Sequence, residues 1–258
     1  MLMERSSALS QPVRQKPPGK KREEDDKKEV EEEGTAIKGI FKLYLLCTSL
    51  VFPSVYYARG NESFHFAGHD ISIRESMDTY GALIWPGATA LCQFLENNQQ
   101  QVNLMDKAVL EIGAGTGLVS IVASLLGAWV TATDLPDILS NLTFNLLRNT
   151  RGRCRYTPQV AALSWGKDLD RDFPYASYHY DFVLAADVVY HHDCLEELLK
   201  TMRHFCRPGS QTTLLWANKI RFQSDLRFTE CFKSHFNATL LTELPQQEIR
   251  IYKATAKE

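Results

Sequence analysis

The sequence has no excess of charge of one sign. Its 29 Lys and Arg residues and 31 Asp and Glu residues give a formal net charge of −2 at pH 7. A protein that binds nucleic acid through many phosphates needs a basic surface. The composition therefore argues against nucleic acid as a partner.

Paired cysteines are also missing. The chain has six cysteines, and none belongs to a C-x-x-C pair, which argues against both a zinc site and a disulfide scaffold. The run His191-His192-Asp193 supplies no third ligand at helical spacing, so we expect no metal. Unpaired cysteines fit a reducing compartment, and we expect the chain in the cytoplasm.

The sequence lacks an apolar run long enough to cross a membrane. The uncharged stretch 43–55 contains Pro53 and is shorter than the roughly 20 residues that a spanning helix needs. We expect it to form a buried accessory element; a segment lying on a membrane surface is the alternative. The charged, polar N-terminus offers no apolar signal sequence for secretion.

Charge distribution divides the chain into two parts. Residues 1–36 are rich in both charge signs and poor in apolar side chains, which predicts a disordered tail. Lys20-Lys21-Arg22 fits a nuclear import signal, and a solvated linker fits it as well. Residues 37–258 form the predicted folded domain, with an accessory segment over 37–107, and we expect a monomer.

A glycine-rich run is the most informative feature of the sequence. Val109 to Ile112 is followed by Gly113, Gly115 and Gly117 at alternate positions, which predicts a buried strand, a tight loop and the start of a helix. Glycines at this spacing leave bare backbone for a ligand. The spacing is one residue shorter than the dinucleotide motif, and no phosphate-binding lysine follows. S-adenosylmethionine, a nucleoside without phosphates, fits best; a turn without a ligand is the alternative.

An acidic residue follows at the expected distance. Asp134 ends the next apolar run, 129–133, where nucleotide-binding α/β units place the carboxylate that binds the ribose. We interpret Asp134 in this way. The alternative is an N-cap for a helix that begins at Pro136.

The remaining pattern alternates between strands and helices. We expect helices over 136–149, 194–206 and 225–236, strands over 180–185 and 212–217, and two closing strands over 238–244 and 249–254. A hairpin is predicted over 64–73. Such alternation predicts an α/β fold with a mostly parallel sheet, helices on both faces and an antiparallel C-terminal edge hairpin.

Several motifs carry a resemblance to a known family. Besides the glycine loop and Asp134-Leu135-Pro136, the chain contains Trp85-Pro86-Gly87-Ala88, Trp165 and Asp187-Val188-Val189-Tyr190. From Phe64 onward it resembles the seven-β-strand protein-lysine methyltransferases, specifically the muscle-type members of the methyltransferase-like twenty-one group. The resemblance implies a Rossmann-like seven-stranded sheet and methyl transfer from S-adenosylmethionine to a lysine. The implied substrate is a valosin-containing AAA ATPase or a heat-shock chaperone.

The same resemblance assigns the cofactor site. It implies that Trp85 lines the pocket, that Gly113, Ala114 and Gly115 form its backbone floor, and that Asp134 binds the ribose. Trp165 would border the adenine, and Ala186 would pack beneath it. Core packing of Trp165 and a turn anchored by Trp85 are the structural alternatives.

The resemblance also assigns two catalytic residues. Asp187 would orient the incoming amine, and Tyr190 would wall the lysine channel; a helix cap by Asp187 and core packing of Tyr190 are the alternatives. A free lysine must lose a proton first, at a cost of roughly 4.6 kcal/mol at pH 7. An apolar channel beside a sulfonium cation offsets part of this cost.

Two other functions compete with this one. A methyltransferase for another substrate class is the first, but the sequence after the fourth expected strand is Ala185-Ala186-Asp187-Val188, not the Asn-Pro-Pro-Tyr type of nucleic-acid amino methyltransferases. A catalytically silent protein that binds partners is the second.

Overall fold

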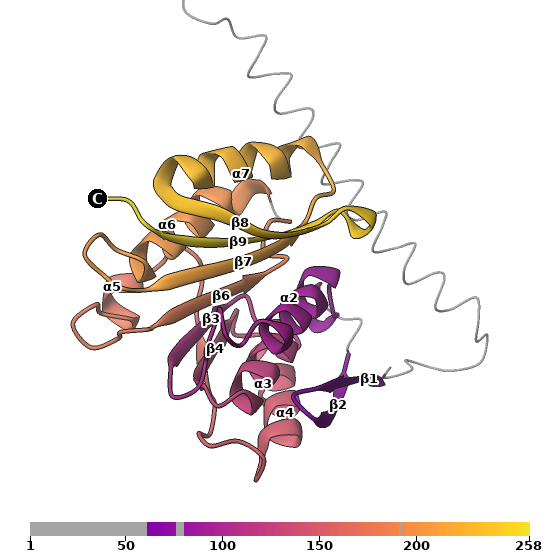
Figure 1. The fold of residues 1–258 in the computed structure, drawn as a ribbon. Helices are drawn as coiled ribbons and strands as arrows, with labels where there is room; N and C mark the ends of the chain where they lie inside the picture. Colours follow the sequence, from indigo (N-terminus) through magenta and orange to yellow (C-terminus); the bar gives the residue numbers. More distant parts are fainter. Residues whose placement is uncertain (1–60, 76–79, 191) are drawn as a thin grey trace, which may run out of the picture.

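The structure is a computed structural model that describes residues 61–75, 80–190 and 192–258 (Figure 1). The predicted tail 1–36, the basic run within it and the apolar stretch 43–55 lie outside the described residues. In the part that is described, no helix is long and apolar enough to cross a membrane.

A seven-stranded sheet forms the centre of the molecule. Its spatial order is β5-β4-β3-β6-β7-β9-β8, in which β5, β4, β3, β6 and β7 pair in parallel and β9 pairs antiparallel with both β7 and β8. This arrangement confirms the predicted fold class. The strands are β3 (Ala108–Ile112), β4 (Trp129–Asp134), β5 (Gln159–Ala162), β6 (Phe182–Ala186), β7 (Thr213–Lys219), β8 (Phe236–Leu244) and β9 (Ile249–Ala256).

Helices cover both faces of the sheet (Figure 1). One face packs against α2 (Pro86–Asn97), α3 (Leu118–Leu125) and α4 (Leu139–Thr150). The other packs against α6 (Leu195–Phe205) and α7 (Gln223–His235). Short elements complete the fold: α5 (Leu169–Asp172) and the 3-10 turns η1 (Tyr80–Ala82), η2 (His192–Cys194) and η3 (Pro245–Gln247).

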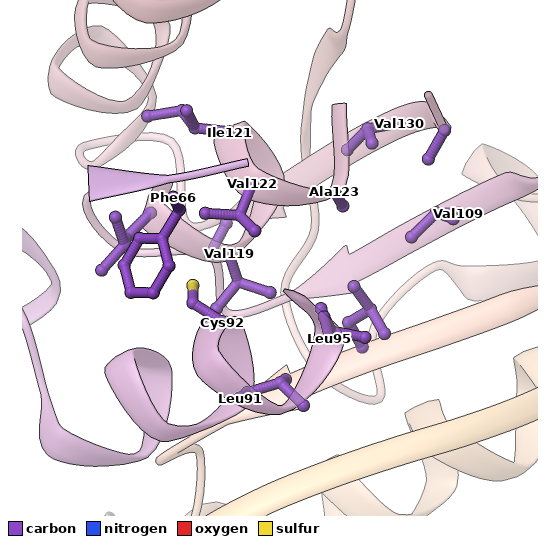
Figure 2. Close-up of a cluster of buried hydrophobic side chains, with 14 of the residues drawn as sticks. Phe66, Leu91, Cys92, Leu95, Val109, Val119, Ile121, Val122, Ala123 and Val130 are labelled. Atoms are coloured by element: carbon purple, nitrogen blue, oxygen red, sulfur yellow. The ribbon is translucent and has the colours of Figure 1, made fainter. Parts of the chain in front are cut away.

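Each face of the sheet has its own apolar core, because successive side chains of a strand point to opposite faces. Val109 joins the cluster beneath α2 and α3, whereas the next residue, Leu110, joins the cluster beneath α6 and α7. Figure 2 shows Leu91 and Leu95 of α2 gathered with Val119 of α3 and Val109 in the first cluster. These two cores hold the strand ends in place, and the loops at those ends build the site.

The predicted hairpin is present, formed by β1 (Asn61–Phe66) and β2 (His69–Arg74). Its turn has positive φ at Ala67 and Gly68, 53° and 73°, as a two-residue hairpin turn of this hand requires. The hairpin lies against the first core through Phe66, Ile71 and Ile73.

One helix begins later than predicted, and the elements α2, β5 and α5 were missed. The helix expected from Pro136 begins at Leu139, because residues 135–138 form a turn closed by a 3.0 Å hydrogen bond from the Ile138 N–H to the Leu135 carbonyl. Within the accessory segment, α2 was not predicted, although Pro86 at its first position is a common helix start. Strand β5 has four residues, too few to show a period.

Candidate active site

A cavity of about 500 Å³ opens at the carboxyl ends of the parallel strands, the edge where α/β sheets bind their ligands. The residues that line it come from the ends of β4 and β6, the loops after β3, β4 and β6, the β5–α5 loop, the segment before α2 and the first turn of α6. All the predicted site residues except Ala114 line this cavity: Trp85, Gly113, Gly115, Asp134, Trp165, Ala186, Asp187 and Tyr190.

The glycine loop presents bare backbone to the cavity. Gly113 has φ +68°, and a Cβ there would meet the Trp165 ring at 3.3 Å and Val188 at 3.0 Å. A Cβ on Gly115, at φ +56°, would lie 2.9 Å from the Gly81 carbonyl oxygen. Ala114 is not among the described residues that line the cavity: its N–H donates to the Thr133 carbonyl at 2.9 Å, and its side chain joins the core. It therefore holds the loop against β4.

Asp134 stands at the end of β4 beside this loop. Its Oδ2 accepts the Gly115 N–H at 2.7 Å, and its Oδ1 accepts the Leu135 N–H at 2.7 Å. The next helix has Ile138 at its N-cap, so Asp134 does not cap it, and that alternative is excluded. Burial raises the pKa of the Asp134 carboxyl, against the lowering effect of the two backbone hydrogen bonds.

Two aromatic rings form one wall of the cavity. Trp165 and Tyr190 lie edge to face, with ring centroids 6.3 Å apart and an interplanar angle of 69°. Burial raises the pKa of Tyr190 to about 12, and the neighbouring Asp134 adds to the rise. The phenol is therefore neutral at physiological pH, and the wall adds no charge to the cavity.

Carboxylates outnumber cations around this space. Asp134, Asp137, Asp187, Asp193 and Glu197 line it, and Lys167 is the one Lys or Arg among the described lining residues. A cationic ligand or side chain is attracted to such a site. Sequence reasoning missed Asp137, Asp193 and Glu197, although Asp137 follows Asp134 so closely that the motif could have suggested it.

The residues present fit S-adenosylmethionine. The Trp165 indole offers a face for adenine, Asp134 offers acceptors for ribose hydroxyls, and the surplus of carboxylates and aromatic rings suits a sulfonium cation. The bare backbone at Gly113 leaves room beside the indole that a side chain would fill.

Comparison with known proteins decides the family. A family model described as lysine methyltransferase matches residues 65–235. This chain belongs to the lysine methyltransferase family. Among relatives of this methyltransferase, bovine (Bos taurus) "Protein-lysine methyltransferase METTL21E" is 54% identical over 76% of this chain and 67% of its own length. Mouse (Mus musculus) "EEF1A lysine methyltransferase 3" is 37% identical over 76% of this chain and 82% of its own.

Solved structures show the same fold at low identity. The Thermus thermophilus 16S rRNA N2 G1207 methyltransferase RsmC, in complex with AdoMet and guanosine, has a TM-score of 0.54 and 16% identity over 77% of this chain and 50% of its own. An S-adenosylmethionine-dependent methyltransferase from Agrobacterium tumefaciens has a TM-score of 0.54 and 15% identity over 80% of this chain and 73% of its own. The chain is thus a protein-lysine methyltransferase, and its cofactor is S-adenosylmethionine.

In this lysine methyltransferase, both oxygens of the Asp187 carboxylate accept hydrogen bonds from other residues of the chain. Its side chain is 1% exposed. Oδ2 accepts the Gly87 N–H, while Oδ1 accepts the Lys219 N–H at 2.9 Å and an Arg221 Nη1–H at 2.9 Å. The interpretation that Asp187 orients the amine stays a prediction, but the geometry favours a positioning role at the start of α2. Tyr190 lines the cavity, as the predicted channel wall requires.

Another buried carboxylate, Glu111, lies outside the described lining. Its Oε2 accepts a hydrogen bond from the Ser120 hydroxyl of α3, and it is 2% exposed. Burial raises the pKa of Glu111 to about 8. It therefore ties the strand before the glycine loop to the helix after it, as a largely protonated acid at neutral pH.

Proposed function

We propose that this methyltransferase modifies a lysine of a valosin-containing AAA ATPase or of a heat-shock chaperone. The resemblance to the methyltransferase-like twenty-one group supports these two substrates, since its relatives act on such proteins. The relatives named METTL21E and METTL21A, at 54% and 34% identity, support the same group. A 37%-identical relative is named for elongation factor EEF1A, which makes that factor the second candidate.

The surplus of carboxylates around an aromatic-walled cavity is the observation that supports lysine as the side chain that receives the methyl group. Asp137, Asp193 and Glu197 attract a side chain that arrives as an ammonium ion. Beyond them, the uncharged wall of Trp165 and Tyr190 disfavours the ammonium form and lowers the lysine pKa. The proton leaves to solvent water, because no buried base is required once the pKa has fallen.

The cofactor supplies a methyl carbon activated by a sulfonium, and the protein supplies alignment. Gly113 and Gly115 give the backbone floor, Asp134 the ribose acceptors, and Trp165 the face for the adenine. Asp187 acts on the incoming amine in our proposal through the start of α2, which it holds in place beside Trp85, and Tyr190 bounds the channel directly.

The test uses the full chain and methyl-labelled S-adenosylmethionine. A valosin-containing ATPase, a heat-shock chaperone and elongation factor 1A are incubated in parallel, and any label is located by mass spectrometry. The Asp134→Ala variant serves as the control for cofactor-dependent transfer. A labelled lysine on either of the first two proteins supports the proposal. Transfer to elongation factor 1A alone, or to a nuclease-sensitive product, contradicts it.

We further propose that the protein acts as a monomer in the cytoplasm and the nucleus. The lack of any C-x-x-C pair among its six cysteines and the basic run Lys20-Lys21-Arg22 support this placement. Fluorescence microscopy of the tagged chain, with and without this run replaced by alanines, tests the nuclear part. Sedimentation of the purified chain tests the monomer.

A further inference from the structure

Arg221, in the loop between β7 and α7, contacts two residues that line the cavity, Trp85 and Asp187. It is not among the described residues that line the cavity. Its guanidinium carbon lies 5.3 Å from the centroid of the Trp85 ring. One of its nitrogens, Nη1, donates to Asp187 Oδ1 at 2.9 Å and to the Lys219 carbonyl at 3.2 Å. The Arg221 side chain thus contacts both the Trp85 indole and the buried Asp187 carboxylate.

Trp85 stands directly before the first turn of α2, and its carbonyl accepts the Ala88 N–H at 3.0 Å. It occupies the N-cap of α2 in an extended conformation, and its indole makes no capping hydrogen bond. Pro86, at the first helical position, has no N–H to offer. The first free N–H of the helix belongs to Gly87, and it donates to Asp187 Oδ2. The Asp187 carboxylate, which follows the end of β6, therefore caps α2 in place of a local residue.

The close fit at Gly87 shows how tightly this contact is built. A Cβ at Gly87 would lie 2.7 Å from Asp187 Oδ2, so any larger residue would push the carboxylate away. The Asp187 side chain is 1% exposed and that of Arg221 is 16% exposed. A buried carboxylate is costly without a counter-charge, and Arg221 provides it. Removing the guanidinium would leave the charge uncompensated and release the cap.

We propose that Arg221 is a positioning residue for cofactor binding, which acts by fixing Trp85 through Asp187 and through the cation–π contact. Removing Arg221 lets α2 start in more than one orientation, so that the indole no longer closes the cavity. This inference rests on the cofactor assignment and not on which protein is methylated.

The test measures binding of S-adenosylhomocysteine to the full chain by isothermal titration. We expect Arg221→Gln to raise Kd about tenfold, in line with the loss of a cation–π contact and one charged hydrogen bond. Arg155→Gln is the matched control: Arg155 pairs with Asp106 at 3.0 Å and lies 5.6 Å from the Tyr156 ring, away from the cavity. Its Kd should stay within twofold of the unsubstituted chain.

A double-mutant cycle separates positioning from a general loss of stability. In a Trp85→Leu background, Arg221→Gln should change Kd less than twofold, because the group on which it acts is gone. A tenfold effect in both backgrounds, or no effect in the unsubstituted chain, overturns the proposal. If Arg221→Gln does not fold, Arg221→Met, which also removes the charge, replaces it in the cycle with the same criteria. No binding by the unsubstituted chain contradicts the cofactor assignment instead.

Discussion

Asp134 and Gly115 are joined by a 2.7 Å hydrogen bond from the glycine N–H to the carboxylate. The bond links the end of β4 to the loop after β3, so it holds the Asp134 carboxylate against the glycine loop. A carboxylate has about four acceptor positions, and two are used by backbone N–H groups. The remaining positions are left for ribose hydroxyls.

Asp134→Asn should raise the Kd for S-adenosylhomocysteine at least tenfold. The amide places an NH2 group against one of two backbone donors, and a lost charged hydrogen bond costs roughly 1.5–3 kcal/mol. Isothermal titration measures the effect. Asp181→Asn is the control, since Asp181 accepts the Ala108 N–H at 2.8 Å at the opposite end of β3. Equal affinities for both variants would show that Asp134 does not bind the cofactor.

Gly113→Ala should abolish cofactor binding, whereas Gly152→Ala should not change it. Both glycines have positive φ, +68° and +72°, so both substitutions carry a similar backbone cost of about 1 kcal/mol. At Gly113 the added Cβ also meets Trp165 and Val188, while at Gly152 nothing lies within 4 Å. Titration with S-adenosylhomocysteine and thermal unfolding separate the two effects. Unchanged binding by Gly113→Ala would contradict the floor assignment.

Glu111→Gln should remove a pH dependence of stability. The pKa of Glu111 is about 8 in the folded chain and 4.5 in its ordinary state, so the folded state holds a proton that the unfolded state releases. The free energy of unfolding therefore falls as pH rises from about 4.5 to about 8, by on the order of a few kcal/mol.

Denaturant unfolding at pH 5, 7 and 9 checks this expectation. The Gln variant should be more stable than the unsubstituted chain at pH 9, and the difference should shrink towards pH 5. Glu62→Gln, at an exposed position, is the control and should show no such trend. Parallel curves for Glu111→Gln and the unsubstituted chain would refute the role of this carboxyl.

Asp187→Asn distinguishes the two roles considered for this residue. As a positioning residue, Asp187 caps α2 and pairs with Arg221, so the variant should lose several degrees of Tm and bind S-adenosylhomocysteine more weakly. If Asp187 instead orients the amine, kcat should fall while Tm and Kd stay unchanged. Calorimetry and titration on one preparation decide between them. An Asn variant with unchanged Tm, Kd and kcat would contradict both roles.

Local pattern was sufficient for most of the fold. The run around Val109 is almost entirely apolar, which is typical of a buried parallel sheet, the run around Val130 alternates apolar residues with threonine, and both form the predicted strands. The pattern failed where it was short or absent. Strand β5 has four residues, and the start of α2 is capped by Asp187, a hundred positions away in the chain, which no local window contains.

The candidate site likewise contains residues that a local pattern indicates and residues whose contacts depend on distant parts of the chain. The glycine spacing and Asp134 are local signals, and Gly113, Gly115 and Asp134 all line the cavity. The partners of Asp187 depend on the order of the strands. Gly87, Lys219 and Arg221 meet this carboxylate only because β7 lies next to β6 and α2 begins above them.

The sequence alone thus determined the α/β sheet, the glycine loop and the acid that follows it, since each depends on the spacing of neighbouring residues. The tertiary structure alone decided that Asp137, Asp193 and Glu197 also surround the cavity and what each carboxylate contacts. Hydrogen bonds and ion pairs act over a few ångströms in space, and the distance along the chain does not predict them.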